Sequence, residues 1–148
     1  MRLSITESED VYAWGWNESG QTGLPAPQGV YSSSCEASAD DDSYGILLEP
    51  TLLELESACP EQHLGENQFL SISAVACGQR HSAAVTSRGL VITWGWGKYG
   101  QLDGEVVDCG DEGRTGKGRL PTAVLGLSEA AEGLRRVWCG PWCTLVGG

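Results

Sequence analysis

Short runs of β-branched, aromatic and small apolar residues alternate with glycine-rich turns along much of the chain. The clearest pair is Ser82 to Thr86 and Leu90 to Trp94, joined by the tight Ser87-Arg88-Gly89 turn. Such runs, bounded by glycines, are the pattern of a β-hairpin. The second run continues into Trp-Gly-Trp-Gly and then Gly100-Gln101.

The same pattern predicts strands elsewhere in the chain, at an N-terminal strand before a turn at Glu7 to Asp10, Val11 to Trp14, Ile46 to Leu55, Leu70 to Cys77, Leu120 to Leu125, Leu134 to Trp138 and Trp142 to Val146. Pro50 has no N–H to give to a ladder and therefore favours an edge position for its strand. Ser128 to Gly133 is predicted to be a helical turn. The fold class that follows is all-β.

Parts of the chain repeat one another. Three shifts show this, pairing VYAWGW (11–16) and Gly20-Gln21 with VITWGW (91–96) and Gly100-Gln101, Cys77-Gly78 with Cys139-Gly140, and PTLL (50–53) with PTAV (121–124). Internal repeats of this kind indicate one supersecondary unit used more than once. The register also aligns Met1 with His81 and Gly148 with Thr86, so the chain begins inside one copy and stops inside another.

The repeated residues resemble a known family. Cys-Gly-x-x-His-Ser, then Gly-x-Val-x-x-Trp-Gly, then Gly-Gln-Leu are similar to the repeat of the regulator of chromosome condensation family, which forms seven-bladed β-propellers. The doubled Trp-Gly-Trp and the late Cys139-Gly140-Pro141-Trp142 resemble the C-terminal part of a small vertebrate member of that family. Thr22 and Asp103 depart from the Gly-Gln-Leu-Gly pattern, and Cys143 stands where the repeat has His81.

The resemblance implies a partial β-propeller of about two blades. A ring needs about four to eight blades of roughly 40 to 50 residues each, so 148 residues cannot close one. We expect the C-terminal portion of a larger propeller or a truncated product, in which the remaining blades or another chain close the ring. A two-blade protomer that closes a ring by homo-oligomerisation is the alternative, and the unequal lengths of the two units argue against it.

Most of the distinctive residues have structural explanations within such a repeat. Tryptophans fill the wedge between neighbouring blades, glycines permit tight turns or close backbone approach, and glutamine amides can satisfy loop backbone groups. The residues given this role are Trp14, Gly15, Gly20, Gln21, Cys77, Gly78, His81, Trp94, Gly95, Gly100, Gln101, Cys139 and Gly140.

Charge divides the chain into domains of different character. The net charge is −11, and residues 1–66 hold 13 acidic residues with Arg2 as their one strong base. Residues 25–45 are rich in Pro, Ser and Asp and are predicted to be a flexible insertion between residues 1–24, a partial blade, and residues 46–148, the remaining blade strands. Asp40, Asp41 and Asp42 are candidate contacts for a basic partner, with a solvated loop as the alternative. An acidic segment disfavours direct DNA binding but suits histone tails.

Six cysteines, without a secretory signal or an apolar run long enough for a membrane, favour a reducing compartment. The segment from Trp138 to Cys143 looks like a thioredoxin site, but one extra residue separates its cysteines and no long helix can follow. A zinc site from Cys77, His81, Cys139 and Cys143 lacks the usual second ligand pair. His81 has no nucleophile or carboxylate partner, so a buried histidine with satisfied hydrogen bonds is the simpler interpretation. No cofactor is expected.

The resemblance also implies a function. It suggests a non-enzymatic interaction module in the nucleus, on chromosomes and also in the cytoplasm, that binds a JmjC-domain histone-modifying oxygenase and contributes to histone-methylation control and chromosome segregation. The alternatives are regulation of a Ran-like GTPase by nucleotide exchange and a non-functional fragment. The tryptophans also invite comparison with the family's plant ultraviolet photoreceptor, but they follow the generic blade positions and the arginines are too few.

Overall fold

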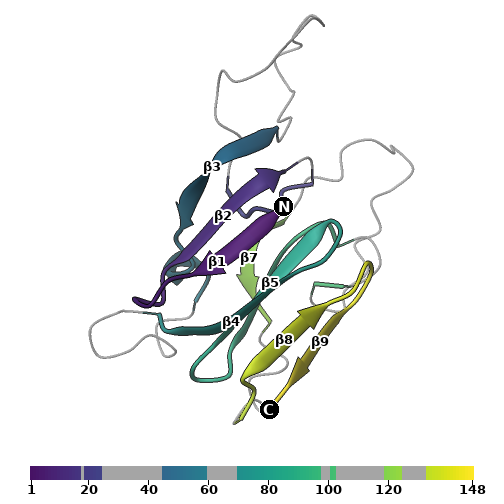
Figure 1. Cartoon of the computed structure of the whole chain (residues 1–148). Coiled ribbons are helices and arrows are strands. Elements are labelled where there is room, and N and C mark those ends of the chain that lie inside the picture. Colours follow the sequence, from purple (N-terminus) through teal and green to yellow (C-terminus); the bar gives the residue numbers. More distant parts are fainter. Residues whose placement is uncertain (18, 25–44, 60–69, 98–100, 103–118, 125–132) are drawn as a thin grey trace, which may run out of the picture.

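The computed structural model describes residues 1–17, 19–24, 45–59, 70–97, 101–102, 119–124 and 133–148. Within them the strands form three antiparallel sheets that succeed one another in chain order (Figure 1). The strand bounds are β1 Arg2–Ile5, β2 Val11–Trp16, β3 Ile46–Leu53, β4 Ile72–Cys77, β5 His81–Thr86, β6 Val91–Gly95, β7 Arg119–Ala123, β8 Arg136–Cys139 and β9 Thr144–Gly147. The all-β prediction is confirmed.

The first sheet has the order β1-β2-β3, the middle sheet β4-β5-β6-β7 and the last sheet β8-β9. A short 3₁₀ turn, η1 (Glu56–Ala58), follows β3. None of the helical structure in the described ranges is long and apolar enough to cross a lipid bilayer.

The sequence repeat is also a repeat in strand pairing. In the first sheet Arg2 pairs with Trp14 and Leu3 with Ala13, and 80 residues later Ser82 pairs with Trp94 and Ala83 with Thr93. The last sheet repeats the β4–β5 hairpin 62 residues on, because Cys139 pairs with Thr144 as Cys77 pairs with Ser82. The first sheet therefore corresponds to β5-β6-β7 and the last sheet to β4-β5.

Two glycines show how closely the copies match. Gly15 and Gly95 have φ values of +102° and +97°, in the left-handed region that favours glycine. A Cβ at Gly15 would lie 2.9 Å from Met1 Cα, and a Cβ at Gly95 would lie 2.9 Å from His81 Cα. Met1 thus occupies in the first sheet the place that His81 occupies in the middle sheet, as the repeat register predicts.

The core lies between the sheets in two clusters. Val11 and Leu53 of the first sheet pack with Ile92 and Trp94 of the middle sheet, and Val85 on the opposite side of the middle sheet packs with Val137 of the last sheet. Trp94 is fully buried, as expected for a ring that fills the space between blades. Trp14 is only half-buried, since none of the described sheets packs against its side of the first sheet.

The predicted elements differ from the observed ones mainly at their ends. Strand β3 ends at Leu53 and the last two strands begin at Arg136 and Thr144. Pro50 does lie in an edge strand, since β3 ends the order of the first sheet. The insertion predicted at 25–45 and the turn at 128–133 lie outside the described residues except for their last positions, so the domain division remains a prediction.

Candidate functional site

Hydrogen bonds between sheets explain the repeated Gly-Gln and Ser/Thr positions. Ser82 Oγ donates to the Gln21 carbonyl at 2.6 Å, and Thr144 Oγ1 donates to the Gln101 carbonyl at 2.8 Å. These two bonds are equivalent, each joining a hairpin strand to the loop of the preceding sheet. Trp94 Nε1 adds a second donor to the Gln21 carbonyl at 2.9 Å. The repeat is therefore held together across its sheets by a backbone acceptor.

The predicted role of the glutamine side chains is confirmed for one of them. Gln21 Oε1 accepts a bond from the Ser19 N–H at 2.7 Å, which satisfies a buried loop donor. Gln101 is buried at the corresponding place. Gly100, its predicted partner in the motif, lies outside the described residues.

The Cys-Gly-x-x-His turn packs tightly around His81. The Gly78 N–H donates to the His81 carbonyl at 2.8 Å, and Gly140 makes the same bond to Cys143. A Cβ at Gly78 would overlap the His81 ring and lie 2.7 Å from the Gly140 carbonyl oxygen. Glycine is required there because the imidazole fills the space.

His81 itself is buried, but its hydrogen bonds differ from the expectation. Neither ring nitrogen has a hydrogen-bond partner among the described residues. Burial lowers the pKa of His81 below its ordinary value, and the Cys143 backbone opposes that shift in part. The expectation of a satisfied buried histidine is thus correct for burial and wrong for hydrogen bonding, because apolar neighbours and glycine backbone surround the ring so closely.

The cysteines near this turn are partly buried thiols. Cys139 Sγ donates to the Ala76 carbonyl at 3.6 Å, and burial, with smaller contributions from Cys77 and Cys143, raises the pKa of Cys139 to about 11. Burial also raises the pKa of Cys77. A thiol with so high a pKa is protonated at neutral pH and is a poor nucleophile. Within the described ranges, no three His, Cys, Asp or Glu side chains come together as a metal site.

Aromatic rings gather where the middle and last sheets meet. The Arg80 guanidinium lies 5.5 Å from the centroid of the Trp96 ring, and the Trp96 and Trp142 centroids are 5.9 Å apart. Arg80 and Trp142 hold the same position in the repeated turn. Trp142 is still about half exposed, so this group forms part of the surface.

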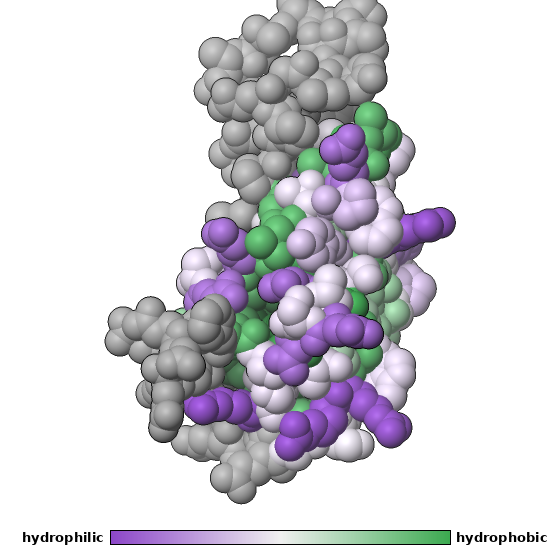
Figure 2. Space-filling model, turned by 60° about the vertical axis from the view of Figure 1, so that its left-hand side comes forward, coloured by the Kyte–Doolittle hydropathy of each residue, from purple (hydrophilic) through white to green (hydrophobic). Residues whose placement is uncertain are grey.

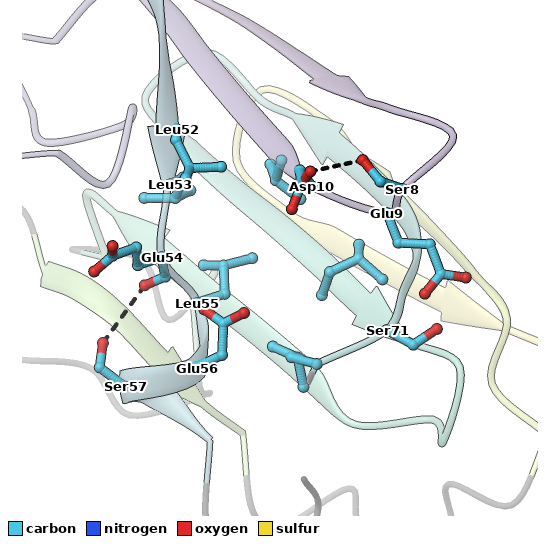
Figure 3. A pocket seen from close by; sticks show the side chains of 13 residues that line it. Ser8, Glu9, Asp10, Leu52, Leu53, Glu54, Leu55, Glu56, Ser57 and Ser71 are labelled. Atoms are coloured by element: carbon cyan, nitrogen blue, oxygen red, sulfur yellow. Dashed lines mark hydrogen bonds between the residues drawn. The ribbon is translucent and has the colours of Figure 1, made fainter. Parts of the chain in front are cut away.

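A pocket of about 570 Å³ lies between the first and middle sheets (Figure 3). Its walls come from the β1–β2 turn, the end of β3 with η1, and the start of β4. The apolar lining is formed by Val11, Leu52, Leu53, Leu55, Leu70 and Ile72. The pocket thus opens onto the core that joins the two sheets.

The polar lining of the pocket is acidic. It contains four carboxylates, Glu9, Asp10, Glu54 and Glu56, and three serines, Ser8, Ser57 and Ser71, with no cationic side chain. Ser8 Oγ donates to Asp10 Oδ2 at 2.7 Å, and Figure 3 shows this bond at the rim. In Figure 2 strongly hydrophilic side chains interrupt the hydrophobic surface on this side of the molecule. Unneutralised carboxylates beside apolar surface favour a cation with an aliphatic stem.

The sequence did not predict this pocket, although it contained a signal for it. Glu9-Asp10 directly precede β2, and Glu54 directly follows β3. Val11 pairs with Leu53 in an antiparallel ladder, which brings these two acidic strand ends together. The acidic residues singled out instead, Asp40, Asp41 and Asp42, lie outside the described residues.

The family comparison agrees with the geometry of the sheets. Regulator of chromosome condensation (RCC1) repeats match residues 8–85 and residues 72–101. The chain belongs to the RCC1 repeat family. The resemblance drawn from the Cys-Gly and Trp-Gly motifs is therefore confirmed.

Among curated proteins the chain is similar to RCC1 domain-containing protein 1 of Mus musculus, at 36% identity over 97% of the chain, and of Homo sapiens, at 33% over 97%. It spans only 38% and 39% of the length of these two relatives. Among solved structures it is similar to human WBSCR16, with a TM-score of 0.54 and 24% identity over 93% of the chain and 26% of that structure. That likeness supports the fold.

Proposed function

We propose that this RCC1-repeat chain is a non-enzymatic protein-interaction module of chromatin. In this proposal it binds a JmjC-domain histone-modifying enzyme in the nucleus and contributes to histone-methylation control and chromosome segregation. The observation that carries the interaction role is the acidic pocket between the first and middle sheets, whose chemistry suits a basic segment of a protein partner.

The physical argument rests on charge and shape. An arginine or lysine side chain has a long aliphatic stem and a cationic end, and the pocket offers Leu53 and Leu55 beside Glu54 and Glu56. The chain as a whole carries a net charge of −11, which raises the association rate of a basic partner and repels the phosphates of DNA. Histone tails have the required chemistry.

A binding assay tests this proposal. A fluorescent basic histone-tail peptide should bind the chain, and Glu54→Gln together with Glu56→Gln should weaken binding about tenfold or more through the loss of two charges. Glu49→Gln is the matched control, since Glu49 is an exposed carboxylate on β3 outside the pocket lining. Equal binding by the pocket variant and the control would refute the pocket as the docking site.

Two further assays separate the finer parts of the proposal. Co-purification of the chain with a JmjC-domain oxygenase supports the partner assignment, and its failure removes it while leaving the peptide result untouched. Nucleotide release from a Ran-like GTPase tests the competing exchange activity. Clear acceleration of release by the chain would replace the interaction module with a GTPase regulator.

A further inference from the structure

Large exposed apolar side chains gather on the two ends of the stack of sheets. Those that the described residues expose most are Trp16, Ile46, Leu48 and Leu52 in the first sheet, Trp138 and Leu145 in the last sheet, and Trp142 in the turn between β8 and β9. The middle sheet exposes none of comparable size. Contiguous apolar surface of this kind marks an interaction site.

The exposed side chains lie on the sides of the end sheets that face away from the middle sheet. Val11 and Leu53 face the middle sheet, so by strand alternation Tyr12 and Leu52, which pair with each other, point the other way. We call this side, with Trp14, the β1–β3 outer face. Val137 faces the middle sheet in the last sheet, so Trp138 and its pairing partner Leu145 form the β8–β9 outer face.

Each outer face corresponds to a face that is buried inside the same chain. Tyr12 and Trp14 correspond to Ile92 and Trp94, which are both 0% exposed. Leu145 is 61% exposed, whereas its equivalent, Ala83, is 0% exposed. The two internal junctions therefore show what an outer face does when another sheet of the same type lies against it.

We propose that the β8–β9 outer face of one copy of this chain packs against the β1–β3 outer face of a second copy. The contact repeats the relation between successive sheets within the chain, so it is head-to-tail. The unequal unit lengths do not oppose it, because the difference lies between β2 and β3 and between β6 and β7, while the paired strands keep one register.

Charge selects the head-to-tail arrangement over a symmetric one. All carboxylates of the described residues lie within residues 1–59, and the arginines other than Arg2 lie in the middle and last sheets or the turns that join their strands. Two β1–β3 outer faces brought together would join like charges. The β8–β9 outer face brings Arg136 close to the acidic end of the second copy, which is electrostatically complementary.

Sedimentation equilibrium of the purified chain, from micromolar to near-millimolar concentration, tests the proposal. The wild-type chain should self-associate, and Leu52→Asp and Leu145→Asp should each weaken self-association by more than about a hundredfold, because a buried carboxylate without a partner is strongly unfavourable. Both side chains are exposed, so the variants should fold, which far-ultraviolet circular dichroism checks. Thr51→Asp, beside Leu52 but on the opposite side of the strand, is the matched control.

Mixing the two single variants gives the decisive result. A mixture of Leu52→Asp and Leu145→Asp retains one intact junction, between the unaltered outer face of each, and should form a heterodimer and nothing larger. A wild-type chain that stays monomeric would overturn the proposal. So would self-association that the mixture fails to restore, because that result indicates a symmetric contact.

Discussion

The Gln21 carbonyl offers a sharp test of how neighbouring sheets hold together. It accepts bonds from Ser82 Oγ at 2.6 Å and from Trp94 Nε1 at 2.9 Å, and all three residues are buried. Ser82→Ala leaves the carbonyl with one donor and should lower the free energy of unfolding by about 1 kcal/mol, the net value of one hydrogen bond. Trp94→Phe removes the other donor and also some packing.

The double variant should cost more than the sum of the two single variants. With both donors gone, a buried carbonyl has lost these partners, which costs about 1–3 kcal/mol for its desolvation. We therefore expect a coupling free energy of about 1 kcal/mol or more between Ser82 and Trp94. The packing loss of Trp94→Phe is the same with or without Ser82, so it cancels in the cycle.

Urea denaturation followed by far-ultraviolet circular dichroism measures the four free energies. Thr51→Ala is the control, since its exposed hydroxyl bonds only locally to the Glu49 carbonyl at 3.1 Å and its loss should change stability by less than about 0.5 kcal/mol. Additivity of the two single variants within about 0.5 kcal/mol would refute the idea that the shared carbonyl joins the sheets.

Three other perturbations have defined outcomes. Gly95→Ala should destabilise far more than Gly133→Ala by urea denaturation, since both have positive φ but only the Gly95 Cβ meets backbone, 2.6 Å from the Arg80 oxygen; equal losses would contradict the clash. The folded-state pKa of His81 lies below its ordinary value, so stability should fall as pH drops below about 6.5, with a slope of up to about 1.4 kcal/mol per pH unit that His81→Gln removes; identical pH slopes would contradict it. In alkylation at pH 8 read by mass spectrometry, exposed Cys143 should react well before Cys139, whose pKa of about 11 leaves about a hundredfold less thiolate than an ordinary thiol; equal rates would contradict the burial of Cys139.

The strand register was predictable from the sequence because the repeat fixes it. The 80-residue shift places Trp14 on Trp94, and the structure pairs them with Arg2 and Ser82, which are themselves 80 residues apart. Local composition alone identifies each hairpin. Identical motifs at a constant offset further require identical pairing, so this part of the fold followed without three-dimensional information.

The exposure of individual side chains was less predictable, because it depends on neighbours outside the motif. Trp14 and Trp94 have the same local sequence and the same pairing, yet one is half-buried and the other fully buried. His81 was predicted to be buried, but its missing hydrogen bonds depend on the approach of Gly140 from the last sheet. Periodicity assigns a side of a strand and cannot say what covers that side.

The acidic pocket shows the same limit at the level of function. The repeat comparison directs attention to shared residues, and these are the ones that build the junctions between sheets. Glu9, Asp10 and Glu54 sit just outside the repeated motifs, at strand ends that the β2–β3 ladder brings together. A scaffold of equivalent junctions leaves specificity to the residues that differ between copies, so the partner chemistry of this chain should lie at such strand ends and turns.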